Sequence, residues 1–187
     1  EAPHRWIRTS GKAGAVPDAT VLVVDDSPIT RAVIGRRLRD AGFEVVEAAD
    51  GVEGAVSAYR IRPQVVVTDL EMPLMDGCQL ARLLKNDPLT SHTPVIILTT
   101  HREAASRFWG ETAGADAYLV KDDVERDLVA TVERLADAGT RPAGSGDVPP
   151  DGSTAILGRV ARQLDRGLLE ATVVTRVLRE GVEAETL

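Results

Sequence analysis

Short runs of apolar residues recur through the middle of the chain, and segments of helical periodicity separate them. Three runs are apolar at every position, which is typical of parallel strands that are buried on both faces. These runs comprise residues 21–24, 65–67 and 95–98, and two weaker strands are expected at 43–48 and 117–120. Strands that alternate with helices in this way predict an α/β fold with a doubly wound, five-stranded parallel sheet.

Segments with apolar residues at three- and four-residue steps are expected to form five helices, at residues 29–41, 52–59, 78–86, 103–113 and 124–138. Ser27 and Pro28 suit the start of the first helix, because serine caps helix N-termini and proline fits the first helical turn. Gly42 and Gly114 suit helix ends, where the chain often turns into a left-handed conformation. We therefore expect residues 19–138 to form one domain.

The segments on either side of this domain have a different composition. Residues 1–18 hold several glycines and prolines and predict an N-terminal leader or linker, and residues 139–153 predict a flexible linker. Residues 154–187 have the spacing of one amphipathic helix, although each of its three glycines weakens a helix by about 1 kcal/mol. The pattern fits a dimeric coiled coil, packing against a folded domain, or disorder. Because the chain does not begin with Met and ends in helix-like sequence, we expect a fragment of a longer protein.

Composition narrows the functional classes. Hydrophobic residues make up 43% of the 187 residues, which is enough for a real core, and the formal net charge of −7 argues against binding nucleic acid. The single cysteine, Cys78, cannot form an internal disulfide and is expected to be an unreactive core residue. Without a long apolar segment to span a membrane, a cytoplasmic location is expected.

Polar residues follow the expected strands at the points where ligands bind in an open parallel sheet. They are Asp25, Asp26, Asp69, Thr99 and Lys121. Carboxylates about 5 Å apart repel each other by roughly 3 kcal/mol per pair, so three of them at one rim require a cation. Oxygen ligands favour Mg²⁺, with Mn²⁺ as an alternative.

An aspartate beside such a metal can accept a phosphoryl group. In this arrangement Lys121 and the metal would neutralise charge on the phosphoryl oxygens, and Thr99 could donate a hydrogen bond to one of them.

Taken in order, these segments resemble the receiver domain of bacterial two-component response regulators. The resemblance covers residues 20–138 and implies a flavodoxin-like sheet with strand order 2-1-3-4-5. It is carried by the acidic pair in Val23-Val24-Asp25-Asp26-Ser27, by Thr68-Asp69-Leu70-Glu71-Met72-Pro73 with Asp76-Gly77 behind it, by Pro94-Val95-Ile96-Ile97-Leu98-Thr99, and by Ala117-Tyr118-Leu119-Val120-Lys121.

The resemblance also implies roles for individual residues. Asp69 would take a phosphoryl group, as an acyl phosphate, from a sensor histidine kinase or a phosphotransfer protein. Asp26 would be a direct Mg²⁺ ligand, Asp25 a ligand through water, and the Glu71 backbone carbonyl a further ligand. Thr99 and Tyr118 would rearrange on phosphorylation.

The expected output is a change of surface at the fourth helix, fifth strand and fifth helix, around Arg107, Trp109 and Tyr118. This change would control homodimerisation or an output domain or effector. We expect a switch with slow self-dephosphorylation rather than an enzyme, although a catalytic domain such as a diguanylate cyclase could follow. A phosphate-independent interaction module is the rival interpretation, and the complete set of polar residues argues against it.

The sequence departs from the family pattern at two places. Asp122 follows Lys121 where proline is usual, so we expect a trans Lys121–Asp122 bond, with Asp122 or Asp123 capping the last helix. Thr100 occupies a position that is usually Ala or Gly. We expect Glu71, Thr100 and His101, which flank the site, to set the lifetime of the acyl phosphate.

Overall fold

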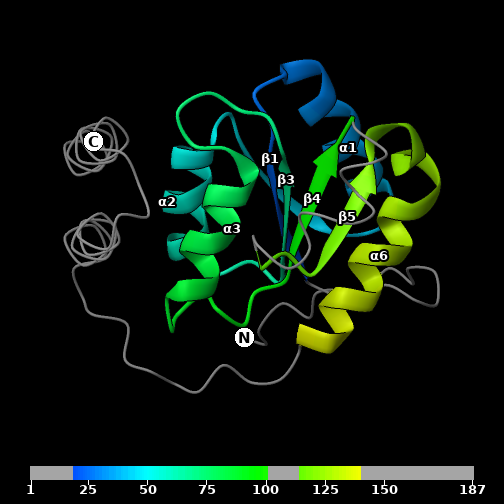
Figure 1. The fold of residues 1–187 in the computed structure, drawn as a ribbon. Helices are drawn as coiled ribbons and strands as arrows, with labels where there is room; N and C mark the ends of the chain where they lie inside the picture. The colour runs from blue at the N-terminus through cyan, green and yellow to red at the C-terminus, as the bar shows by residue number, and fades with distance from the viewer. Residues whose placement is uncertain (1–18, 101–113, 140–187) are drawn as a thin grey trace, which may run out of the picture.

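A five-stranded parallel sheet forms the centre of the structure, a computed structural model in which residues 19–100 and 114–139 are described. The strand order is β2-β1-β3-β4-β5 (Figure 1), so the doubly wound fold and the 2-1-3-4-5 order are confirmed. The strands are β1 (Thr20–Val24), β2 (Glu44–Ala48), β3 (Val65–Asp69), β4 (Val95–Thr99) and β5 (Ala117–Val120).

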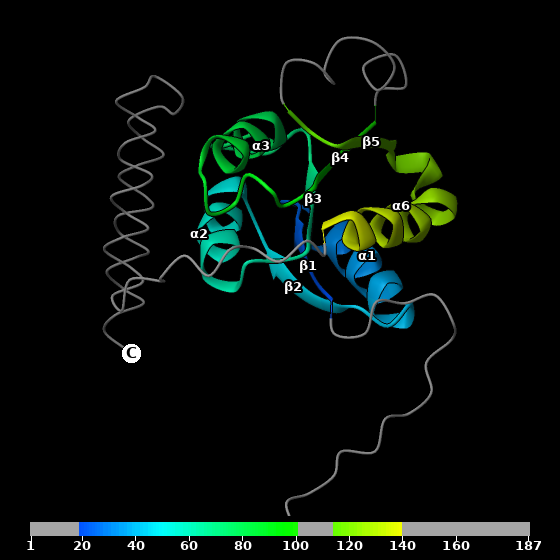
Figure 2. The ribbon, with the colours of Figure 1, turned by 90° about the horizontal axis from the view of Figure 1, so that it is seen from below.

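Helices cover both faces of this sheet. Figure 2 shows α2 and α3 on one side and α1 and α6 on the other. The helices are α1 (Pro28–Asp40), α2 (Gly51–Ile61), α3 (Gly77–Asn86) and α6 (Val124–Gly139), and a 3-10 turn, η1 (Lys121–Asp123), leads into α6. Among the described helices, none has both the length and the hydropathy to cross a membrane.

Several expected segments lie outside the described residues: the leader at 1–18, the helix at 103–113, the linker from residue 140 onward and the amphipathic helix at 154–187. Gly139, which was expected to begin the linker, is instead the last residue of α6.

Strand β1 supplies both halves of the core, because its side chains point alternately to the two faces of the sheet. Leu22 and Val24 pack in a cluster with residues of α2 and α3, whereas Val21 and Val23 pack in a cluster with residues of α1 and α6. All four side chains are at most 1% exposed. The uniformly apolar strand in the sequence thus reflects burial on both faces.

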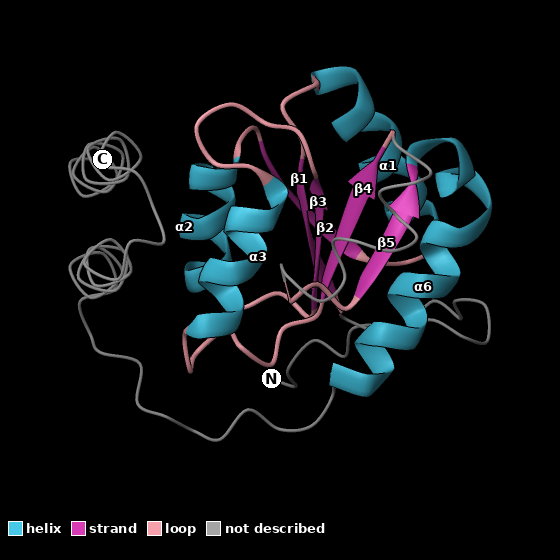
Figure 3. Ribbon diagram, in the orientation of Figure 1, coloured by secondary structure: helices cyan, strands magenta, loops and turns pink. Residues whose placement is uncertain are grey.

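Side-chain caps fix where the helices begin, directly after the loops at the carboxyl ends of the strands (Figure 3). Ser27 accepts a hydrogen bond from the backbone N–H of Thr30, as expected for the cap of α1. Asp50 caps α2, and Asp76 and Gln79 form a reciprocal capping box at α3. Because each cap satisfies backbone N–H groups, the loops that carry the site residues enter their helices in a defined direction.

The loop from β3 to α3 folds back tightly on the end of its own strand. The Gly77 N–H donates to the Leu70 carbonyl over 3.0 Å. A Cβ atom at Gly77 would lie only 2.1 Å from the backbone carbonyl oxygen of Asp69. Since this neighbour is backbone, it has little freedom to move, and only glycine lets α3 begin this close to the end of β3.

Replacement of Gly77 by alanine is therefore expected to destabilise the protein by about 3 kcal/mol, because the loop must shift to relieve the clash. Gly114→Ala is a suitable comparison, since its Cβ would meet only the Lys85 side chain, at 3.5 Å. Its positive φ of 71° should cost about 1 kcal/mol. Urea unfolding of both variants measures the difference, and equal losses would contradict the close-approach argument.

Candidate functional site

Three carboxylates meet at the carboxyl ends of two adjacent strands. Asp25 and Asp26 directly follow β1, and Asp69 is the last residue of β3. The two strands pair in parallel with Val24 opposite Thr68, which brings the residues that follow to the same edge. One carboxylate oxygen from each of the three aspartates lies within 4.8 Å of the others. The sequence-based prediction of an acidic rim thus agrees with the geometry.

Burial differs among these carboxylates. Asp25 is completely buried and Asp69 is 6% exposed, whereas Asp26 is exposed. The Asp25 carboxylate accepts a hydrogen bond from the Ser27 N–H at 2.9 Å. The Asp25 carboxylate is therefore fixed by the protein, while Asp26 faces solvent.

Lys121 brings a positive charge to this acidic group. It begins η1 directly after β5, and its Nζ lies 2.9 Å from Asp69 Oδ2 and 3.2 Å from Asp25 Oδ2. One ammonium thus bridges two carboxylates that come from different strands. This contact spans 96 residues of sequence between Asp25 and Lys121.

Burial and these charges act in opposite directions on the pKa values. Burial raises the pKa of Asp69 above its usual value, and the hydrogen bond and charge of Lys121 offset this only in part. Burial alone would lower the pKa of Lys121, but the contacts with Asp69 and Asp25 outweigh it and leave that pKa raised. Lys121 therefore keeps its proton and its positive charge at neutral pH.

Thr99 and Tyr118 lie on the neighbouring strands β4 and β5. Thr99 ends β4, is 2% exposed and is opposite Val120 in the register of β4 and β5. Tyr118 lies in β5 opposite Ile97, and its side chain is partly buried against the core. Burial raises the pKa of Tyr118 to about 12, so its hydroxyl keeps its proton and can act as a hydrogen-bond donor.

The residues expected to tune the lifetime of a phosphoryl group are placed only in part. Glu71 and Thr100 are exposed in the loops after β3 and β4, and His101 lies outside the described residues, as do Arg107 and Trp109. The Lys121–Asp122 peptide bond is trans, as predicted. Asp122 and Asp123 belong to η1, and a capping role for either stays a prediction.

Cys78 is buried at the first turn of α3, as its position in the sequence indicated. Burial raises the pKa of its thiol to about 11, which keeps the thiol protonated and poorly nucleophilic at neutral pH.

The donor set fits a hard divalent cation. Its ligand atoms are carboxylate oxygens, which Mg²⁺ prefers, and one aspartate is open to solvent so that the ion can keep water ligands. Lys121 offsets part of the negative charge but leaves a net negative site. These features match the Mg²⁺ expectation, and a ligand role for the Glu71 carbonyl stays a prediction.

One residue that contacts this loop was not identified from the sequence. Arg31, in the first turns of α1, donates from Nη1 to the backbone carbonyl of Asp25 at 2.6 Å. An arginine on an amphipathic helix usually indicates a solvated face, so no sequence signal distinguishes it.

Comparisons with known proteins identify the class to which this parallel α/β fold and its acidic rim belong. The family model described as the response regulator receiver domain matches residues 21–133. The chain belongs to this family.

Among curated relatives, Protein PilH of Pseudomonas aeruginosa is 38% identical over 117 residues, which are 63% of this chain and 97% of PilH. Transcriptional regulatory protein PrrA of Mycobacterium tuberculosis is 41% identical over 64% of this chain and 51% of PrrA. A gliding motility regulatory protein of Myxococcus xanthus is 40% identical over 71% of this chain but only 17% of its own length. The chain therefore spans about half or less of the length of the two larger relatives.

Among solved structures, chemotaxis response regulator CheY4 of Vibrio cholerae matches with a TM-score of 0.59 and 35% identity, over 63% of this chain and 98% of CheY4. The receiver domain of sensor histidine kinase PA1611 of Pseudomonas aeruginosa, solved with a magnesium ion coordinated in its active site cleft, matches with a TM-score of 0.59 and 28% identity, over 64% of this chain and 98% of that domain.

The Lys121 contact generates a prediction for the Asp69 carboxylate. In Lys121→Met, the pKa of Asp69 should rise above its wild-type value, because the burial and the Asp25 charge that raise it remain while the lowering contact is lost. An NMR titration of the Asp69 carboxyl carbon in metal-free protein measures this pKa. Lys85→Met is the matched control, since Lys85 pairs with Asp116 instead. If the pKa of Asp69 is unchanged or lowered in Lys121→Met, the Lys121 contact does not stabilise the ionised Asp69 carboxylate.

Proposed function

We propose that this chain is a phosphorylatable switch of two-component signalling, in which Asp69 accepts a phosphoryl group with the help of Mg²⁺. The observation that carries the proposal is the contact of Lys121 with Asp25 and Asp69 beside the solvent-exposed Asp26. A set of three carboxylates and one ammonium at a strand edge is costly to assemble unless it binds a ligand. Family membership supports the same interpretation.

In the proposed reaction, an Asp69 carboxylate oxygen attacks the phosphorus of a phosphohistidine on a kinase or phosphotransfer protein. The O–P bond forms as the N–P bond breaks, and the histidine nitrogen leaves with the electron pair. Lys121 pairs with charge on the transferred oxygens, and Thr99 donates a hydrogen bond to one of them. Asp25, Asp26, Asp69 and the Glu71 carbonyl would hold Mg²⁺, which supplies further charge neutralisation.

Burial raises the pKa of Asp69 above its usual value. The attack requires the ionised carboxylate, and the contact with Lys121 favours that form. The proposed consequence is a shift of Thr99 and Tyr118 that alters the surface around β5 and α6. We place this activity in the cytoplasm and assign the whole protein's output to a partner or to a further domain. The magnesium ion coordinated in the active site cleft of the PA1611 receiver domain is consistent with the metal assignment.

Incubation of the full chain with acetyl phosphate and Mg²⁺ tests the chemistry directly. Intact mass measurement should find a gain of one phosphoryl group, which hydroxylamine removes because it cleaves acyl phosphates. The gain should be absent with a chelator or in Asp69→Asn, and should persist in Asp40→Asn, a control at the exposed end of α1. A gain that survives Asp69→Asn, or none in the wild type, would favour a phosphate-independent module.

Homodimerisation is a separate part of the proposal. Light scattering of the full chain with beryllofluoride and Mg²⁺, which mimic the phosphoryl group, should give a higher molar mass than the untreated protein. Asp69→Asn should remain at the untreated value, because the mimic binds at the acceptor. An unchanged mass in the wild type would remove dimerisation from the proposed output without affecting the phosphorylation test.

A further inference from the structure

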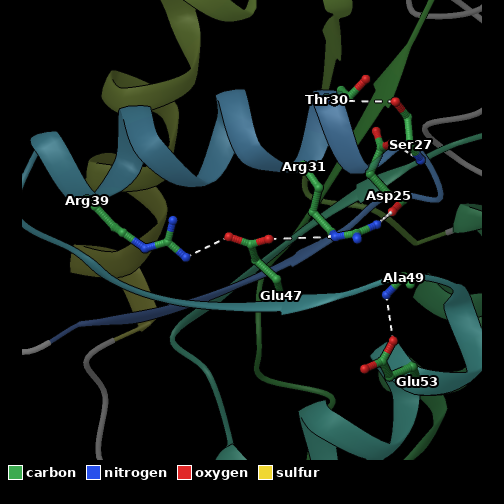
Figure 4. A network of polar contacts seen from close by, with 8 residues as sticks. All are labelled: Asp25, Ser27, Thr30, Arg31, Arg39, Glu47, Ala49 and Glu53. Carbon is green, nitrogen blue, oxygen red and sulfur yellow. Dashed lines mark hydrogen bonds and ion pairs between the residues drawn. The ribbon is translucent and has the colours of Figure 1, made fainter.

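A chain of charged side chains runs from the acidic loop to the outer edge of the sheet (Figure 4). At its inner end, Arg31 Nη1 donates to the backbone carbonyl of Asp25 at 2.6 Å. The Arg31 Nε lies 3.6 Å from Glu47 Oε2, and Glu47 Oε1 lies 2.6 Å from Arg39 Nη2. The carboxylate of Glu47, on edge strand β2, therefore links two arginines of α1.

The carbonyl that Arg31 contacts belongs to the peptide bond between Asp25 and Asp26. Because a peptide unit is planar, fixing its oxygen fixes the orientation of the whole unit. The direction in which Asp26 leaves the loop depends on that orientation. On the other side of Asp25, its backbone N–H donates to Ala48 O at 3.2 Å, so the residue is held from both directions.

Arg31 is in turn held in place. Its side chain is only 18% exposed, and a guanidinium can hold a carbonyl and a carboxylate at once because its donors lie in a rigid plane. Glu47 also balances the arginine's charge. Such balance matters beside a cation site, because an uncompensated positive charge would repel the bound ion.

The helix makes room for this arrangement at one position. A Cβ atom at Gly35 would lie 2.8 Å from Glu47 Oε1 and 3.1 Å from Arg39 Nη1. A side chain there would require the Glu47 carboxylate to shift away from its present position beside α1. A helix-interior glycine costs about 1 kcal/mol relative to alanine, and the space it leaves is filled by this ion pair.

We propose that Arg31, supported by Glu47, is a positioning residue that fixes the Asp25–Asp26 peptide and thereby sets the Mg²⁺ affinity of the site. The inference rests on the proposed Mg²⁺ site. It differs from a general charge effect in sign: removal of a nearby positive charge should tighten cation binding, whereas loss of the anchor should weaken it.

The test is an Mg²⁺ titration of the ¹⁵N-labelled full chain, followed by NMR at the amides around Asp26 and Asp69. Arg31→Met should weaken Mg²⁺ binding by about tenfold, the scale on which residues that orient metal ligands act. In metal-free protein its Asp26 amide should also shift, since the peptide unit has reoriented. Arg36→Met, which removes the same charge from an exposed position of α1, should stay within about twofold of the wild type.

Each outcome decides a different claim. Equal or tighter Mg²⁺ binding in a folded Arg31→Met would overturn the positioning role while leaving the metal site intact. Failure of the wild type to bind Mg²⁺ would overturn the proposed site and the inference with it. If circular dichroism finds Arg31→Met unfolded, Arg31→Lys replaces it, because it keeps the positive charge but has no planar group that holds the Asp25 carbonyl and the Glu47 carboxylate at once. Several-fold weaker binding would then support the proposal, and an unchanged affinity would overturn it.

Discussion

Electrostatic repulsion among three carboxylates within 4.8 Å of one another is the constraint on which this site depends. At such distances each pair costs roughly 3 kcal/mol in a medium of intermediate dielectric, which is a large fraction of the stability of a small domain. The Lys121 ammonium relieves part of this cost by contacting the two buried members. The exposed Asp26 remains, and a divalent ion would balance its charge. Electrostatic cost and ligand binding are thus two aspects of one arrangement.

The sheet topology is what allows these charges to meet. Because β1 and β3 are adjacent and parallel, their carboxyl ends lie at one edge, and β4 and β5 extend that edge toward Lys121. The buried strands leave no room for these polar groups inside the core, so the polar residues collect where the strands stop. Gly77 then lets α3 begin against the Asp69 carbonyl, which keeps the loop between β3 and α3 short.

Elements with strong periodicity were predictable from the sequence, and so were the residues at the strand ends. The strands at 21–24 and 95–98 were found to within one residue, because burial on both faces leaves an uninterrupted apolar run. Asp69 and Lys121 were expected together because the rule for parallel sheets depends only on strand ends. Distances, burial and the bridging geometry of Lys121 were not predictable, since they depend on side-chain packing across 96 residues of separation.

Arg31 and Gly35 illustrate the limit of pattern-based prediction more sharply. In the sequence, an arginine and a glycine on the first helix indicate a solvated face and a weak point, respectively. In the fold both belong to one ion-pair arrangement, because β2 places Glu47 against the helix surface at the point where Gly35 lacks a side chain. The roles of both residues depend on the edge strand β2, which neither residue adjoins in sequence. Gly35 weakens α1, but the space it leaves lets Glu47 hold Arg31 in contact with the loop that follows β1.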